Sequence, residues 1–193
     1  TGDAHVYGET APGQPTPGWW EQIVGPGRII DTERYFVVAA NVLGGCQGST
    51  GPASLAPDGV PWGSRFPVIS TRDQVRAEAL LSDLLGVHTW DIVIGTSLGG
   101  HRAIEWAVTY PERVRRLVVV ASGAQTTADQ AAWTHTQIRA IELDPAWRGG
   151  DYYAGPGPCA GLALARQIAH TTYRSPSELD ERFGRIPQND EDP

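Results

Sequence analysis

Ser97 lies at the centre of the sequence Gly95-Thr96-Ser97-Leu98-Gly99, a spacing that is typical of a nucleophilic serine. A strand that turns sharply into a helix holds one side chain clear of a sheet only where its neighbours are small. We therefore expect Gly95 and Gly99 to be required by close packing. The helix that follows would turn the backbone N–H of Leu98 toward the oxyanion of a tetrahedral intermediate. The pattern predicts acyl transfer, with Ser97 as the nucleophile and Leu98 as an oxyanion donor.

A serine hydroxyl needs a histidine to accept its proton and an acidic residue to orient that histidine. In this arrangement the acidic residue and then the histidine follow the serine along the chain. The histidines after Ser97 are His101, His135 and His170, and none is in a loop that follows a late strand. We interpret each of the three as a structural or cap-face histidine. We expect the catalytic base and its acidic partner to be absent from these 193 residues.

The elements expected to hold the serine alternate between helix and strand. Residues 70–86 predict a helix, with a cap at Ser70 or Thr71 and an end at Gly86. Residues 90–94 and 115–121 are apolar runs typical of buried strands, and residues 100–110 favour a helix between them. This alternation predicts an α/β fold with a parallel sheet and crossover helices. Residues 34–42 predict one more buried strand.

The character of the sequence changes after residue 125. Before the predicted helix at residues 70–86, residues 1–27 and 44–68 are rich in glycine and proline and predict irregular loops. From residue 127 onward the pattern is helical, over residues 127–143, 161–173 and 177–183, and a polar tail follows at 185–193. We expect a partial α/β core over residues 1–125 and a helical cap region over residues 126–193.

Composition excludes several classes of partner. The net charge of −7 and the scattered arginines provide no basic field for nucleic acid. The longest apolar runs are strand-sized, so no membrane span is predicted, and the absence of a leader pattern favours the cytoplasm. Cys46 and Cys159 lie in unrelated contexts, which predicts reduced thiols and no metal site. The chain contains no methionine, so we expect that Thr1 is not the native start.

Three longer motifs are similar to those of the homoserine O-acetyltransferases, which are members of the α/β-hydrolase superfamily. They are residues 41–52 (NVLGGCQGSTGP), residues 94–100 (IGTSLGG) with residues 105–107 (EWA), and residues 144–153 (DPAWRGGDYY). The resemblance runs through the whole chain. It implies a partial α/β-hydrolase fold with a helical cap, and transfer of acetyl from acetyl-CoA to the hydroxyl of L-homoserine, a step of methionine biosynthesis.

The resemblance also implies roles for individual residues. Ser97 would carry the acetyl group in a ping-pong reaction, and Leu98 would supply an oxyanion amide. Arg166 and Tyr173 match the substrate-contacting arginine and tyrosine of the family. Their spacing of seven places both on one face of a helix, and a guanidinium suits an amino-acid carboxylate. Acetyl-CoA would be a substrate with no bound cofactor, the partners would be small molecules, and the full-length protein would form a homodimer.

The sequence departs from the family pattern in two ways. Thr96 and Leu98 replace the glycine and methionine that typically flank the serine, which predicts a changed acyl or acceptor pocket. Family members are also close to twice as long, with core strands before Thr1 and strands that carry the aspartate and histidine after the cap. We therefore expect a fragment with little activity of its own. The alternatives are a serine O-acyltransferase or a carboxyl-ester hydrolase of the same fold, and a non-catalytic fragment.

Overall fold

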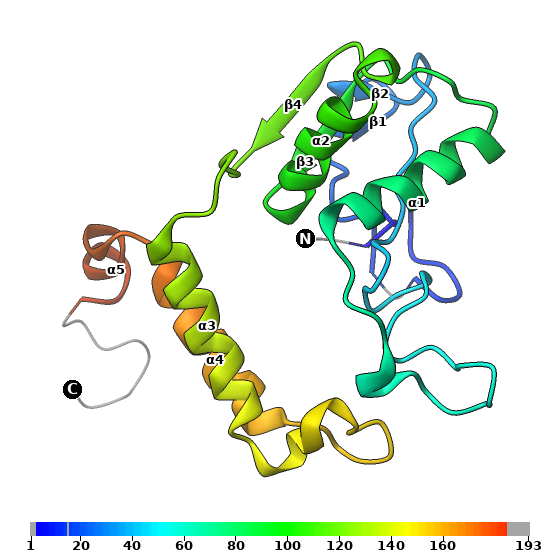
Figure 1. Cartoon of the computed structure of the whole chain (residues 1–193). Coiled ribbons are helices and arrows are strands. Elements are labelled where there is room, and N and C mark those ends of the chain that lie inside the picture. The colour runs from blue at the N-terminus through cyan, green and yellow to red at the C-terminus, as the bar shows by residue number, and fades with distance from the viewer. Residues whose placement is uncertain (1–2, 15, 185–193) are drawn as a thin grey trace. The chain divides into compact units, whose positions relative to one another are not determined.

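A computed structural model describes residues 3–14 and 16–184 of the chain. The chain divides into two compact units, Thr1–Ala124 and Gln125–Pro193 (Figure 1). The predicted polar tail at 185–193 lies outside the described residues. The use of the second unit as a cap stays a prediction. No helix in the described ranges has both the length and the apolar character needed to cross a membrane.

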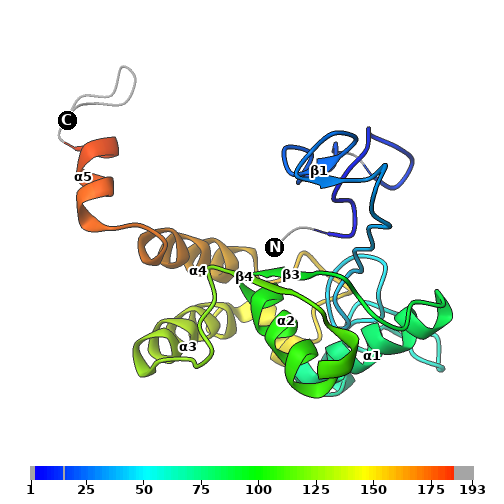
Figure 2. The same ribbon diagram turned by 90° about the horizontal axis from the view of Figure 1, so that it is seen from above.

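The first unit contains the expected alternation of helix and parallel strand. Its central elements are α1 (Thr71–Leu84), β3 (Val93–Thr96), α2 (Leu98–Thr109) and β4 (Leu117–Val120). The strands pair in parallel, with Val93 opposite Leu117 and Thr96 opposite Val120. Helix α2 packs against both strands, and α1 packs against α2 (Figure 2). The α/β prediction for residues 70–121 is confirmed, with the strand limits shifted by one to three residues.

Helix α1 begins where the sequence indicates. The Ser70 side chain accepts a hydrogen bond from the Asp73 backbone N–H, and the Asp73 carboxylate accepts one from the Ser70 N–H. This capping box satisfies backbone groups that the first turn would otherwise leave without partners. One face of α1 then buries Val75 and Ala79 against Trp106 of α2. Capping and this apolar contact together fix α1 beside the helix that follows Ser97.

The predicted strand at residues 34–42 is wrong. Residues 36–42 form neither strand nor helix, and among the described residues no strand pairs with them. Their aromatic and β-branched composition favours a strand, but a ladder also needs a partner backbone. Strands β3 and β4 pair with each other, and the short β1 (Val24–Gly25) pairs with β2 (Ile30–Asp31). Residues 36–40 and Val42 line a cavity instead.

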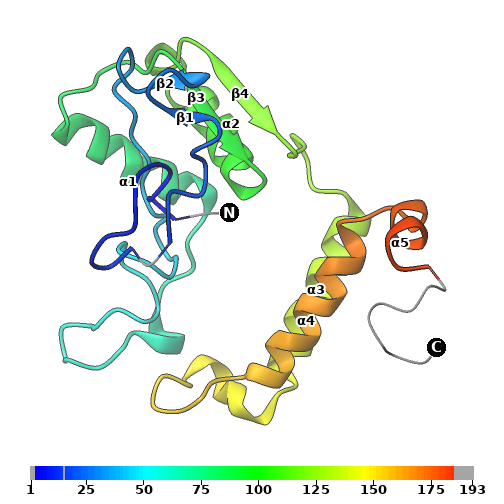
Figure 3. The ribbon, with the colours of Figure 1, turned by 180° about the vertical axis from the view of Figure 1, so that it is seen from behind.

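The second unit is helical. It contains α3 (Ala128–Glu142), a 3-10 segment (Pro145–Gly150) that is kinked at Arg148 and Gly149, α4 (Cys159–Thr172) and α5 (Pro176–Phe183). Helices α3 and α4 lie side by side (Figure 3). The absence of a side chain at Gly161 allows their close approach, since a Cβ there would lie 2.5 Å from the Ala140 carbonyl oxygen. Asp144 joins the turn between them, since its carboxylate accepts hydrogen bonds from Ala146 N (2.9 Å) and Gly161 N (2.8 Å).

Candidate active site

Ser97 occupies a strained turn between β3 and α2. Its backbone angles are φ 53° and ψ −122°, a region that residues with a Cβ rarely adopt. Two sets of backbone hydrogen bonds hold it there. Ser97 N–H donates to the Val120 carbonyl at 3.0 Å, and the Ser97 carbonyl accepts from Gly100 N at 2.8 Å and His101 N at 3.3 Å. The turn presents an exposed serine at the C-terminal end of a parallel strand, the geometry of a nucleophile elbow.

Close packing requires glycine at one of the two positions where the sequence predicts it, and at a further position that it does not predict. A Cβ at Gly95 would overlap the Gly99 carbonyl, so this glycine is required by close packing. A Cβ at Gly99 would meet no atom of the described residues within 4 Å, so the expectation for this position is wrong. The tight position is Gly100, where a Cβ would lie 2.6 Å from the Ser122 Cβ. Glycine is therefore required at Gly100 and not at Gly99, because α2 directs Gly100 toward the end of β4.

Leu98 is the first residue of α2, so its N–H has no acceptor within the helix. The side chains of Ser97 and Leu98 are both exposed. A helix N-terminus carries partial positive charge, which favours negative charge beside this amide. The arrangement is chemically able to present a hydroxyl to an acyl carbon and an N–H to the resulting oxyanion.

Histidines of the first unit do not contact the serine hydroxyl. These residues are His5, His88 and His101, and in the described part of this unit no ring nitrogen is hydrogen-bonded to Ser97 Oγ. His101 reaches Ser97 through its backbone N–H alone. His135 lies on α3 and His170 on α4 of the second unit.

The two residues assigned to the substrate by resemblance belong to the second unit. Arg166 is an exposed residue of α4. Tyr173 is the C-cap of the same helix, keeps helical backbone angles (φ −88°, ψ −6°) and is 73% exposed. Two turns of continuous helical backbone therefore separate them, and both side chains are available to a ligand.

Sequence reasoning missed Ser122, which follows β4. Its hydroxyl donates a 2.5 Å hydrogen bond to the Ser97 carbonyl oxygen and lies 3.2 Å from the Val120 carbonyl oxygen. No sequence motif marks this residue. The parallel register of β3 and β4 brings the two strand ends together, so the signal lies in tertiary structure.

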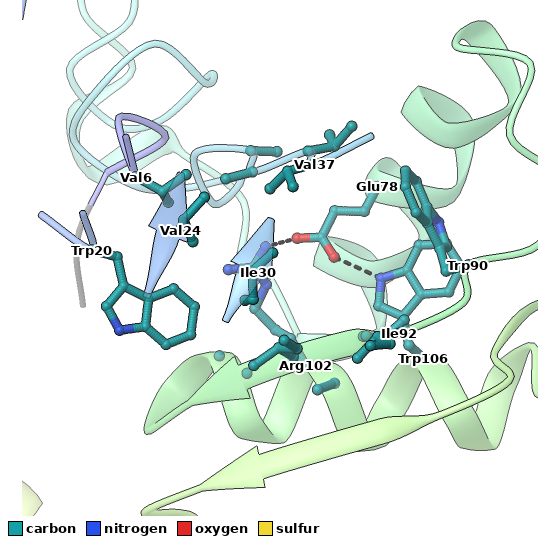
Figure 4. A pocket seen from close by; sticks show the side chains of 18 of the residues that line it. Val6, Trp20, Val24, Ile30, Val37, Glu78, Trp90, Ile92, Arg102 and Trp106 are labelled. Carbon is teal, nitrogen blue, oxygen red and sulfur yellow. Dashed lines mark hydrogen bonds and ion pairs between the residues drawn. The ribbon is translucent and has the colours of Figure 1, made fainter. Parts of the chain in front are cut away.

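A cavity of about 410 Å³ extends from the elbow into the first unit, lined by residues 35–40 on one side and by β3 and α2 on the other (Figure 4). Its lining is mostly apolar and includes an ion pair between Glu78 of α1 and Arg102 of α2. The Trp106 indole N–H donates to the Glu78 carboxylate at 2.8 Å. Burial lowers the pKa of Arg102 from its ordinary value. Sequence reasoning did not find this pair because Glu78 and Arg102 belong to different helices.

Comparison with known sequences places the elbow in context. Residues 13–193 match the model of the alpha/beta hydrolase fold family. The chain is 63% identical to a homoserine O-acetyltransferase of Thermobifida fusca (strain YX), over 100% of this chain and 52% of the relative. It is 57% identical to a homoserine O-acetyltransferase of Clavibacter michiganensis subsp. michiganensis (strain NCPPB 382), over 96% of this chain and 48% of that protein. The chain thus spans about half the length of the curated relatives it matches.

Solved structures of similar proteins match the same part of the chain. A homoserine O-acetyltransferase from Bacillus anthracis is 31% identical, with a TM-score of 0.86 over 94% of this chain and 51% of that one. Esterase E22 is 34% identical, with a TM-score of 0.84 over 93% of this chain and 51% of that one. The family match covers most of the chain, and the helices and parallel strands around Ser97 have the matching arrangement. The chain therefore belongs to the α/β-hydrolase fold family.

Proposed function

We propose that this chain carries the nucleophile of a homoserine O-acetyltransferase, which moves acetyl from acetyl-CoA to the hydroxyl of L-homoserine. The observation that carries the proposal is the 63% identity, along the whole chain, to a relative of that name. The strained elbow supports it, because non-glycine residues in such conformations cluster at active sites. The proposal includes the cytoplasm as the compartment and small molecules as the partners, with a homodimer as the assembly.

In the proposed first half-reaction, Ser97 Oγ attacks the thioester carbonyl of acetyl-CoA. The hydroxyl proton passes to a general base, the C–S bond breaks, and CoA leaves as its thiol with acetyl now esterified to Ser97. In the second half-reaction the homoserine hydroxyl attacks this ester and regenerates the serine. Each half-reaction passes through an oxyanion, to which the N–H of Leu98 would donate.

Selection of homoserine would fall to the second unit. Arg166 offers a planar guanidinium for the amino-acid carboxylate, and Tyr173 on the same helix offers a hydroxyl. Both side chains are exposed on α4, which leaves them free to contact a substrate. Serine carries the same carboxylate and a hydroxyl on a shorter side chain, so it is the natural competitor in an acceptor assay.

A second candidate is carboxyl-ester hydrolysis, in which water replaces homoserine as the acceptor. The observation that favours it is the similarity to esterase E22, at 34% identity and a TM-score of 0.84. The elbow serves either reaction, because both pass through the same acyl-serine. The difference lies in whether an acceptor alcohol is bound before water reaches the ester.

The test compares acceptor substrates in two proteins. The 193-residue chain, and a chimera in which it replaces the matching segment of the Thermobifida fusca relative, are incubated with acetyl-CoA and homoserine, serine or water. CoA release is followed against a Ser97→Ala control in each background. We expect homoserine-dependent release in the chimera that Ser97→Ala abolishes. Release that is equal with and without homoserine would favour the esterase. A chimera no faster than its Ser97→Ala control would overturn both functions.

A further inference from the structure

We infer that Ser122 is a positioning residue that aims the oxyanion amide of Leu98. The inference rests on the proposed function, since it concerns the same acyl-transfer site. Ser122 lies just after β4, and its hydroxyl donates to the Ser97 carbonyl oxygen at 2.5 Å. It does not touch the acyl group in the proposed reaction. Its effect passes through one peptide unit.

The Ser97 carbonyl and the Leu98 N–H belong to the same planar peptide group. No peptide bond among the described residues is cis, so these two bonds point in opposite directions across a rigid plane. Rotation of the carbonyl by some angle rotates the N–H by the same angle. A hydrogen bond that fixes the Ser97 carbonyl therefore fixes the direction of the Leu98 N–H as well.

The need for such a bond follows from the strain at Ser97. A φ of 53° with a ψ of −122° is unfavourable for a residue with a Cβ. Such a conformation persists only where several surrounding interactions stabilise it. Gly100 N and His101 N contact the carbonyl from α2, so both contacts come from the helix that carries Leu98. Ser122 contacts it from the end of β4. It ties the peptide plane to the end of β4, a part of the chain outside α2.

Close packing around Ser122 shows that its position is specified. Gly100 has no Cβ, and one built there would lie 2.6 Å from the Ser122 Cβ. The Val120 carbonyl, 3.2 Å from the Ser122 hydroxyl, also accepts the Ser97 N–H at 3.0 Å. Ser122 and Val120 together hold both backbone polar groups of Ser97. A donor on the carbonyl also polarises the peptide, which makes the Leu98 N–H a stronger donor.

The first test needs no catalysis. In the isotope-labelled 193-residue chain, the Ser97 carbonyl carbon and the Leu98 amide are observed by NMR in the wild type and in Ser122→Ala. We expect both resonances to move together, because they report on the two ends of one peptide group. The matched control is Ser82→Ala, which removes a similar hydroxyl-to-carbonyl bond (Ser82 Oγ to Val87 O, 2.6 Å) at the end of α1, together with a 3.0 Å bond that Ser82 Oγ accepts from Arg113 Nη2. This control should leave both resonances in place.

The second test measures acyl transfer in the chimera. We expect Ser122→Ala to lower kcat by about 10- to 100-fold with little change in the KM for acetyl-CoA, because a misdirected donor weakens the transition state rather than the bound substrate. Ser82→Ala should lower the unfolding midpoint at least as much and leave kcat within about twofold of wild type. Ser122→Cys, which keeps a donor at the same position in a slightly larger side chain but donates weakly, should have a kcat between those of Ser122→Ala and wild type. It also serves if Ser122→Ala does not fold.

The two tests separate the inference from the function on which it rests. If the wild-type chimera transfers no acetyl, the proposed function fails, while the NMR result still decides whether Ser122 sets the peptide plane. If the Ser97 and Leu98 resonances of Ser122→Ala and Ser122→Cys match those of Ser82→Ala, the positioning role is wrong. Unchanged kcat in a folded Ser122→Ala chimera overturns it equally.

Discussion

Trp106 and Glu78 are joined by a 2.8 Å hydrogen bond in which the indole N–H of α2 donates to a carboxylate of α1. The same carboxylate forms an ion pair with Arg102, one turn earlier on α2. Both charged side chains are less than 20% exposed. A polar connection thus crosses the helix interface at the base of the cavity, beside the apolar contact of Val75 and Ala79 with Trp106.

Loss of one charge from this pair should be costly. Glu78→Gln leaves Arg102 charged and unpaired in a site where burial already lowers the pKa of its guanidinium, so we expect a loss of about 2–4 kcal/mol in the free energy of unfolding. The double variant Glu78→Gln with Arg102→Met should lose less than Glu78→Gln alone, because no unpaired charge remains. Urea unfolding of the two single variants and the double variant checks this. Additive losses would contradict it.

The strained backbone of Ser97 should lower the stability of the fold, and its hydroxyl should be required for acyl transfer. Ser97→Gly relieves the unfavourable backbone conformation, whereas Ser97→Ala removes the hydroxyl and keeps the strain. We expect Ser97→Gly to be more stable than Ser97→Ala by about 1–2 kcal/mol in urea unfolding, and both to lack acyl transfer. Equal stabilities would mean that the backbone relaxes at this position.

Neighbouring glycines should respond in opposite ways. Gly100→Ala places a Cβ against Ser122 and should destabilise the first unit by about 1–3 kcal/mol. Gly99→Ala has open space and should leave stability unchanged or raise it by up to about 1 kcal/mol, because alanine favours a helix. Thermal unfolding of the two variants provides the comparison. A larger loss of stability for Gly99→Ala than for Gly100→Ala would mean that close packing requires glycine at Gly99 after all.

Acid should weaken the first unit through Glu105. Hydrogen bonds from Arg72 and then Thr109 hold the pKa of this carboxyl below its usual range. A folded-state pKa below the unfolded one stabilises the fold above the unfolded pKa, and that contribution is lost as the pH falls through the folded pKa. We therefore expect stability to decline below about pH 5, and Glu105→Gln to show a shallower decline. Urea unfolding between pH 3 and pH 7 measures both slopes, and parallel slopes would be evidence against a role for Glu105.

Arg166 should affect the acceptor and not the donor. Arg166→Lys keeps the charge but cannot make two parallel hydrogen bonds to a carboxylate, so we expect the KM for homoserine to rise roughly tenfold in the chimera. The acetyl-CoA half-reaction, followed by CoA release, should be unchanged. Arg174→Lys is the control, because Arg174 pairs with Glu178 of α5. An equal change in the KM for homoserine in both variants would mean that Arg166 does not contact the acceptor.

The local part of the fold could be predicted from the sequence, and the pairing of distant segments could not. Ser70 with Asp73 begins α1 as a capping box, a signal contained within four residues. The strand-serine-helix turn was likewise visible, because its elements are contiguous. Residues 36–42 have the composition of a strand, but strand formation depends on a partner that composition does not supply.

The same division holds for the candidate site. Ser97 and Leu98 stand out because the elbow is a short pattern. Ser122 acts on the elbow from 25 residues away through the register of two strands, and Glu78 meets Arg102 through the packing of two helices. Gly99 and Gly100 cannot be distinguished by spacing alone, since the difference lies in which neighbour each one faces.

The open space at Gly99 makes this position an attachment point for a reporter. A Gly99→Cys variant would carry a thiol-linked fluorophore two residues from Ser97, at the border of the cavity. Cys46 and Cys159 are free and exposed, so both must first be replaced for single-site labelling. The emission of such a conjugate would follow the arrival and departure of an acyl group in real time, in a chain whose seven tryptophans make intrinsic fluorescence difficult to assign.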